Sequence, residues 1–333
     1  VNQNVGVLDM SAFGKCRISG SGAEAFLEKM IANKLPKSRG RIILAHSLSV
    51  GGGVHSEFTI MKEKEDSFYL VSAGAAQRLD HDWLKKQMPT DGSVQFTDLT
   101  NSMGVLVVSG PQSRALLQRV TTTDMSNEAF KWLTAKKIDV GYAPTIAARV
   151  NFVGELGWEL HHPIEYQNHI FDALFAAGKE FNVKPFGIRA MDMMRLEKSY
   201  RMVGTEMSIE YSALESGLHR FVKLDKPDFL GREGLVLSNE KKANNQFVTL
   251  HVRDITDADA IGGNPIYNGE KLVGRATSGG YGFRVGFSIA LAMVKPEQAA
   301  IGTMLEIDIL GKKYGAEVIE ESPFDPENAR LRA

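Results

Sequence analysis

The sequence has one cysteine, Cys16, among 333 residues. A single cysteine rules out an internal disulfide framework and is typical of proteins in a reducing compartment. Runs of 18 apolar residues are also missing, so we expect no membrane span. The 39 Lys and Arg residues are balanced by 40 Asp and Glu residues, which leaves no basic excess for binding nucleic acid. An ordinary globular protein without a membrane or nucleic-acid partner is the interpretation that remains.

Several catalytic motifs are absent or incomplete. Gly20-Ser-Gly-Ala-Glu-Ala25 follows a strand pattern and opens a helix pattern, as a dinucleotide-binding loop does. The acid expected about 20 residues later is missing, because Arg41-Ile-Ile-Leu44 stands there. A helix start capped by Ser21 is therefore the favoured interpretation. His161-His162 has no Cys, Asp or second His cluster at ligand spacing, so we expect packed or solvated histidines and no metal site.

Strand and helix patterns alternate over the first two thirds of the chain, and this mixture favours an α+β fold. We expect strands at residues 15–19, 41–49, 56–61, 67–72, 103–109 and 145–152, and helices at residues 22–33, 78–87, 111–120, 167–180 and 188–199.

After residue 245 the pattern changes to short strands between glycine-rich turns, with a hairpin signal at Asn268-Gly269. The charged stretch 235–245 is the expected boundary. The sequence thus predicts an α+β region at residues 1–240 and a small all-β barrel domain at residues 241–333. Strands are expected there at residues 247–252, 270–277, 288–294, 304–309 and 313–319.

The chain begins at Val1, without an initiator methionine, and enters a strand pattern at residues 5–10. Nothing like a signal or transit peptide precedes that pattern. We therefore expect the sequence to be a piece of a longer polypeptide.

The most informative stretch is Phe152-Val-Gly-Glu-Leu-Gly-Trp-Glu159, where a β-rich run breaks at two glycines. It carries two carboxylates, Glu155 and Glu159, with the aromatic residues Phe152 and Trp158 beside them. A carboxylate and a ring suit a flat heterocycle that needs an acceptor for its N–H groups. A hairpin with solvated glutamates fits the same spacing, so the residues alone leave both interpretations open.

Further segments fit one family together with this stretch, which is similar to a Tyr-x-Gly-Glu-Asp-Gly-x-Glu signature. The set resembles the glycine-cleavage T-protein (aminomethyltransferase) superfamily, over residues 5–324. The other matching segments are Val7-Leu-Asp-Met-Ser11, Ser109-Gly-Pro-Gln-Ser113, Gly187-Ile-Arg-Ala-Met-Asp-x-x-Arg-Leu-Glu197, Glu215-Ser-Gly-Leu218, Val222-Lys-Leu-Asp-Lys226, Phe229-Leu-Gly-Arg232, Thr277-Ser-Gly-Gly280 and Ser288-Ile-Ala-Leu-Ala292.

Four positions depart from the T-protein pattern towards the folate-binding C-terminal half of dimethylglycine and sarcosine dehydrogenases. Glu57 stands where a T-protein has Asp, and His46 where it has Tyr. Met191 replaces the Arg of an Ala-Arg-Asp element, and Ser72 opens a segment that begins with Asn in T-proteins. The resemblance therefore favours the tetrahydrofolate-binding part of a demethylating amine dehydrogenase.

The resemblance implies a cloverleaf of α/β subdomains around a central folate hole, followed by the small barrel. It implies an enzyme that passes a one-carbon unit, derived from a small methylated amine, to tetrahydrofolate. FAD is expected only in a missing N-terminal domain or a partner subunit, because no FAD motif stands in this sequence. The implied location is the cytoplasm of a bacterium or the mitochondrial matrix.

The resemblance also assigns roles to single residues. Glu57 is the expected general base, and Glu159 the expected anchor of the pterin ring, with Phe152 against the ring. The other expected folate-binding residues are His46, Ser72 and Arg189, of which Arg189 is a substitute for the missing Arg at position 191.

Three alternatives stay open. One is a true aminomethyltransferase that acts on a lipoyl carrier protein. Another is a non-catalytic folate-binding module, although the cysteine of such modules is missing from residues 222–231. The third is a binding protein for another planar ligand.

Overall fold

The computed structural model describes residues 1–240, 243–255 and 257–333. Contacts divide the chain into two compact units. The first comprises Val1–His46, Ser56–Ile188 and Asn328–Ala333, and the second comprises Ser47–His55 and Arg189–Glu327. The boundary expected at residues 235–245 begins in helix α6, which ends at Glu240, and residues 241 and 242 lie outside the described residues.

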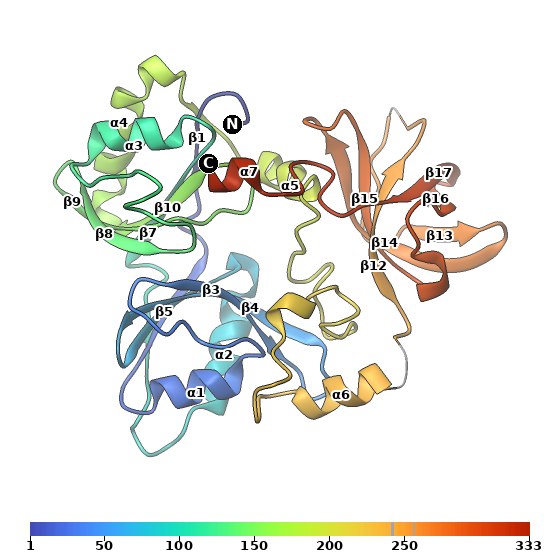
Figure 1. The fold of residues 1–333 in the computed structure, drawn as a ribbon, viewed down its shortest axis with the longest axis horizontal. Helices are drawn as coiled ribbons and strands as arrows, with labels where there is room; N and C mark the ends of the chain where they lie inside the picture. Colours follow the sequence, from blue (N-terminus) through green and yellow to red (C-terminus); the bar gives the residue numbers. More distant parts are fainter. Residues whose placement is uncertain (241–242, 256) are drawn as a thin grey trace. The chain divides into compact units, whose positions relative to one another are not determined.

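The first unit contains a six-stranded sheet with the order β11-β1-β7-β10-β9-β8 (Figure 1). All neighbours are antiparallel except β1 and β11, which run parallel. Helices α3 (Ser113–Val120) and α4 (Gln167–Ala177) contact its strands. The strands are β1 (Gly6–Asp9), β7 (Met103–Ser109), β8 (Ala135–Val140), β9 (Ala143–Ala148), β10 (Gly157–Pro163) and β11 (Lys184–Pro185).

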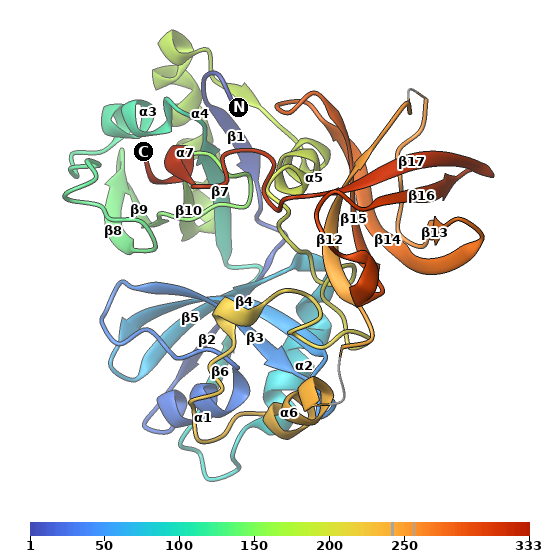
Figure 2. The ribbon, with the colours of Figure 1, turned by 45° about the vertical axis from the view of Figure 1, so that its right-hand side comes forward.

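A five-stranded sheet with the order β3-β4-β5-β2-β6 completes the first unit. Helices α1 (Ala23–Met30) and α2 (Gln77–Gln87) accompany it, and α2 contacts β2 while α1 contacts β5 (Figure 2). The strands are β2 (Gly14–Ser19), β3 (Ile42–Leu48), β4 (Val54–Lys64), β5 (Ser67–Ser72) and β6 (Gln95–Asp98).

Strand alternation explains how these layers pack. On β10, Trp158 and Leu160 point into a core shared with Leu116 of α3 and Leu174 of α4. The next side chains along the strand point to the opposite face, because successive residues of a strand alternate. On that face the two sheets meet in an apolar cluster formed by Ile42, Met61, Tyr69, Val71 and Ala148. Both faces of the central strands are therefore buried.

The second unit contains a closed barrel with the strand order β12-β15-β14-β13-β16-β17. Its interior is filled by small and branched side chains such as Leu250, Ala290 and Ile307, as expected for a narrow barrel. The strands are β12 (Gln246–Val252), β13 (Pro265–Asn268), β14 (Lys271–Gly282), β15 (Phe287–Val294), β16 (Met304–Ile309) and β17 (Lys312–Ile319). The helices of this unit are α5 (Ile188–Leu196) and α6 (Arg232–Glu240), and α7 (Ala329–Arg332) belongs to the first unit.

The α+β class and the C-terminal barrel are confirmed. The strand predicted at residues 145–152 is wrong in its second half, because β9 ends at Ala148. Beyond it Asn151 organises a turn, since its side chain donates to the carbonyl of Glu155 at 2.6 Å and accepts from the amide of Val153 at 3.0 Å. In the described part of the chain, no helix is long and apolar enough to cross a membrane.

Candidate functional site

Glu57 pairs with His46 on the β3–β4 hairpin of the five-stranded sheet. His46 is fully buried, and its Nε2 lies 3.1 Å from Oε1 of Glu57. The Glu57 side chain keeps 22% of its surface exposed, and its second oxygen, Oε2, makes no hydrogen bond within the described residues. The structure therefore brings the expected base together with His46, one of the expected folate-binding residues, and it leaves one carboxylate oxygen open.

A second carboxylate belongs to Asp80 of α2, which is 1% exposed. It accepts hydrogen bonds from the hydroxyls of Ser56 and Ser72, which oppose the effect of burial. Burial is the largest cause that raises the pKa of Asp80, to about 6, and the negative charge of Glu57 raises it further. Ser72, an expected folate-binding residue, thus donates a hydrogen bond to Asp80. Asp80 was not among the expected site residues, because an acid in an amphipathic helix gives no signal of burial in the sequence.

Glu159 of β10 is held by a histidine two residues further along the strand. Its Oε2 lies 3.2 Å from Nε2 of His161, and Nδ1 of His161 lies 3.3 Å from the hydroxyl of Tyr69. All three residues are at least nine-tenths buried. Tyr69 belongs to β5, so this chain of contacts joins the two sheets of the first unit. Oε1 of Glu159 makes no hydrogen bond within the described residues.

The side chains of Trp158 and Glu155 have surroundings different from those of Glu159. Trp158 points to the other face of β10, where its ring stands 6.0 Å from that of Phe130 and 5.5 Å from the Arg149 guanidinium. Glu155 is fully buried, and its Oε2 accepts from Nε of Arg330 at 2.7 Å. Glu155 and Trp158 therefore have partners other than those of Glu159, although all three lie within five residues of the sequence.

The remaining expected ligands lie in different surroundings. Phe152 is partly exposed and lies in the loop after β9. Arg189 is exposed at the start of α5 in the second unit. The roles of both residues stay predictions. His161 was expected only to be packed or solvated, although strand alternation from Glu159 places it on the same face.

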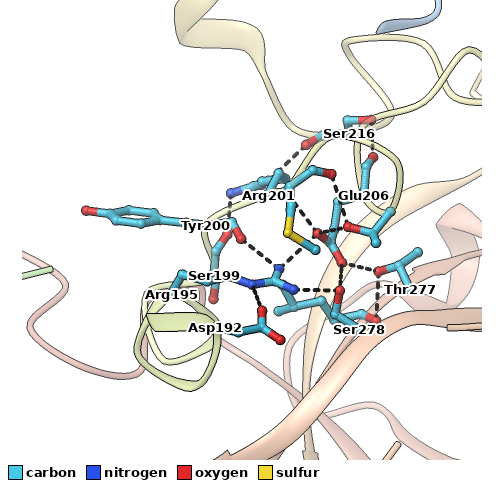
Figure 3. Close-up of polar contacts among 12 residues, drawn as sticks. Asp192, Arg195, Ser199, Tyr200, Arg201, Glu206, Ser216, Thr277 and Ser278 are labelled. Carbon is cyan, nitrogen blue, oxygen red and sulfur yellow. Dashed lines mark hydrogen bonds and ion pairs between the residues drawn. The ribbon is translucent and has the colours of Figure 1, made fainter. Parts of the chain in front are cut away.

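The Arg-Leu-Glu segment of α5 supports a buried polar cluster in the second unit (Figure 3). Nη1 of Arg195 lies 3.0 Å from Oε2 of Glu206, and Glu206 also accepts from Thr277 and Ser278 at 2.6 and 2.5 Å. Burial by itself raises the pKa of Glu206, but the charge of Arg195 and the hydroxyl donors hold the pKa below its usual value. The cluster ties α5 to strand β14, so it is structural.

The geometry fits a flat ligand that presents N–H groups. Glu159 offers one oxygen, Oε1, from a buried and oriented carboxylate, and carboxylates accept such donors strongly. Within the described residues, no group of three or more His, Cys, Asp or Glu side chains could hold a metal ion. Glu159 and Glu57 each present one carboxylate oxygen that can accept a hydrogen bond.

Comparisons with known proteins cover most of the chain. Residues 1–226 match the GCVT N-terminal domain, and residues 245–325 match the glycine cleavage T-protein C-terminal barrel domain. The human mitochondrial dimethylglycine dehydrogenase is 36% identical over 100% of this chain, but the match spans only 38% of that protein. The aminomethyltransferase of Thermoanaerobacter sp. strain X514 is 27% identical over 97% of this chain and 87% of its own length.

A solved structure shares the fold. The glycine cleavage system aminomethyltransferase T from Bartonella henselae matches with a TM-score of 0.87 and 20% identity, over 98% of this chain and 88% of that one. The two matched domain models show that the chain belongs to the glycine cleavage T-protein (GCVT) family.

Proposed function

We propose that the chain is the tetrahydrofolate-binding part of a demethylating amine dehydrogenase of the dimethylglycine or sarcosine type. In this role it helps to transfer a one-carbon unit from an oxidised N-methyl amine to tetrahydrofolate, and the product is 5,10-methylenetetrahydrofolate. The amine is oxidised by an FAD-dependent domain or subunit that works with this chain. The 36% identity to dimethylglycine dehydrogenase over the whole chain supports this choice within the family.

The observation that carries the proposal is the carboxylate of Glu159. The Glu159 side chain is 10% exposed and is held at Oε2 by His161, while Oε1 is open. A carboxylate held in this way accepts N–H hydrogen bonds from the edge of a pterin without rearranging. Phe152 is the proposed ring neighbour, and its partly exposed position after β9 leaves it accessible to a ligand.

Glu57 is the proposed general base. Tetrahydrofolate supplies the ring nitrogens that take up the one-carbon unit. Oε2 of Glu57 accepts the proton that such a nitrogen loses as it bonds to the carbon, while Oε1 stays on His46. Removing a general base of this kind typically lowers a rate by about 10²–10⁴-fold.

Titration with folinic acid tests the pterin anchor. Loss of a hydrogen bond to a charged acceptor is expected to weaken the binding of folinic acid to the Glu159→Ala variant by roughly tenfold to hundredfold. The exposed Glu165 lies just beyond β10, so Glu165→Ala is the matched control and should bind like the wild type. Equal affinity of Glu159→Ala and the wild type would remove Glu159 as the anchor.

A rate measurement tests the base. The Glu57→Gln variant, assayed together with its FAD-dependent partner, should form methylenetetrahydrofolate about 10²–10⁴-fold more slowly and still bind folinic acid normally. Glu65→Gln is the control, because this carboxylate is 93% exposed at the end of the same hairpin strand. An unchanged rate of Glu57→Gln would exclude Glu57 as the base.

The second candidate function is aminomethyl transfer from a lipoyl carrier protein. The observation that favours it is the 27% identity to an aminomethyltransferase over 97% of this chain. A transfer assay with aminomethyl-loaded lipoyl protein separates the two. Turnover in that assay would support the second function, and turnover only with the FAD-dependent partner would support the first.

A further inference from the structure

His161 and His162 are adjacent histidines of β10 with the same burial and different partners. Both are fully buried. His162 points to the face of Trp158, where its Nδ1 lies 2.9 Å from the carbonyl of Leu160 and its Nε2 lies 2.7 Å from Gln167. His161 points to the face of Glu159. The chain therefore offers its own matched comparison for any role of His161.

For a neutral His161 ring, the two contacts of the ring determine the direction of both hydrogen bonds. A carboxylate oxygen only accepts, so Nε2 of His161 carries the hydrogen that is shared with Oε2 of Glu159. Nδ1 then accepts from the hydroxyl of Tyr69. Burial raises the pKa of Tyr69 above its usual value, and the phenol therefore keeps the proton that it donates. Both ring nitrogens of a neutral imidazole are satisfied in this arrangement.

The rings also restrain each other. The Tyr69 and His161 rings stand edge to face, with centroids 5.4 Å apart and planes at 85°. Tyr69 is fully buried in the cluster between the two sheets. A histidine that is wedged against a fixed ring and bonded at both nitrogens cannot rotate, so the carboxylate that it binds is also held in one orientation.

We propose that His161, fixed by Tyr69, is a positioning residue that aims Oε1 of Glu159 at the N–H groups of the bound ligand. The inference rests on the proposed role of Glu159 in folate binding. It adds that the contact with His161 orients the Glu159 carboxylate for the ligand. Without His161, Oε2 of Glu159 loses its hydrogen-bond donor, and the carboxylate is free to rotate towards other donors. Part of the binding free energy is then spent on restoring the orientation.

Four variants of the full chain test this role by titration with folinic acid. His161→Leu removes both ring nitrogens, and we expect about tenfold weaker binding. His161→Gln returns an amide N–H close to the place of Nε2, and we expect affinity within about threefold of the wild type. His162→Leu removes the neighbour of equal burial and should bind as the wild type does. Tyr69→Phe removes only the hydroxyl, and we expect about threefold weaker binding.

Thermal unfolding of each variant separates positioning from packing. His161→Leu and His162→Leu are both expected to lower the Tm, because each deletes the hydrogen bonds of a buried histidine. Only the first should lose affinity for folinic acid. Equal losses in the two variants, or no rescue by His161→Gln, would overturn the positioning role. Should His161→Leu fail to fold, wild-type affinity of Tyr69→Phe would overturn it.

The outcomes also separate this inference from the proposed function. If Glu159→Ala binds folinic acid as the wild type does, the anchor itself fails. If Glu159→Ala weakens binding and His161→Leu does not, the anchor stands and the positioning by His161 is wrong. In the enzyme assay the expected change for His161→Leu is a higher KM for tetrahydrofolate with an unchanged kcat, because Glu57 is untouched.

Discussion

Removing the buried carboxylate of Asp80 should stabilise the first unit in a manner that depends on pH. The pKa of Asp80 is raised from 3.8 to about 6, mainly by burial. A rise of about two pKa units corresponds to roughly 3 kcal/mol. Between pH 4 and pH 6 the native state holds one proton more than the unfolded chain, so the free energy of unfolding falls as the pH rises. Above pH 6 this contribution is constant.

Asp80→Asn removes this titration. The free energy of unfolding of the variant, minus that of the wild type, should therefore grow by roughly 3 kcal/mol from pH 4 to pH 7 and then stay level. Urea unfolding followed by tryptophan fluorescence measures this difference for the first unit, which contains Asp80. All three tryptophans, Trp83, Trp132 and Trp158, lie in the first unit.

One comparison sharpens the test. Glu57 contributes to the raised pKa of Asp80, so the gain from Asp80→Asn should shrink in a Glu57→Gln background. A difference for Asp80→Asn that varies by less than about 0.5 kcal/mol between pH 4 and pH 7 would show that burial does not raise the pKa of Asp80.

Three further substitutions have expected costs. Glu206→Ala removes the buried acid partner of the buried Arg195 guanidinium and leaves it only one acid, the partly exposed Asp192, and the free energy of unfolding in urea should fall by about 3–5 kcal/mol. Gly53→Ala places a Cβ 2.4 Å from the carbonyl oxygen of Ile209; since the obstacle is backbone, circular dichroism should show a Tm several degrees lower. Phe58→Ala empties a fully buried site of the five-stranded sheet, and urea unfolding followed by fluorescence should show a loss of about 3–5 kcal/mol. A cost below about 1 kcal/mol for Glu206→Ala or Phe58→Ala would contradict the stated burial.

Much of the secondary structure follows from local periodicity. The strand predicted at residues 67–72 is β5 without any change, and the helix predicted at 78–87 differs from α2 by one residue. The prediction for residues 145–152 was wrong because the run Arg149-Val-Asn-Phe152 keeps a strand-like composition, while Asn151 forms a turn through its own side chain. Such side-chain bonds to the backbone compete with a sheet, and composition does not reveal which will prevail.

Only part of the candidate site could likewise be predicted from the sequence. Glu57 and His46 stand on two strands joined by a glycine turn, so their proximity was foreseeable from the sequence. Tyr69 and His161 are separated by 92 residues and meet only because the two sheets pack face to face. No local pattern encodes that meeting. The buried Asp80 likewise receives its hydrogen bonds from serines of two different strands, Ser56 and Ser72.

The two carboxylate–imidazole pairs differ in exposure, and this difference bears on their roles. The Glu57 side chain is 22% exposed, whereas that of Glu159 is 10% exposed. A base must pass its proton on to solvent before the next turnover, so it needs contact with water. An acceptor that only orients a ligand gains from the exclusion of water, because its hydrogen bonds strengthen in a poorly solvated site. The exposures therefore support proton transfer at Glu57 and ligand anchoring at Glu159, and they oppose the reverse assignment.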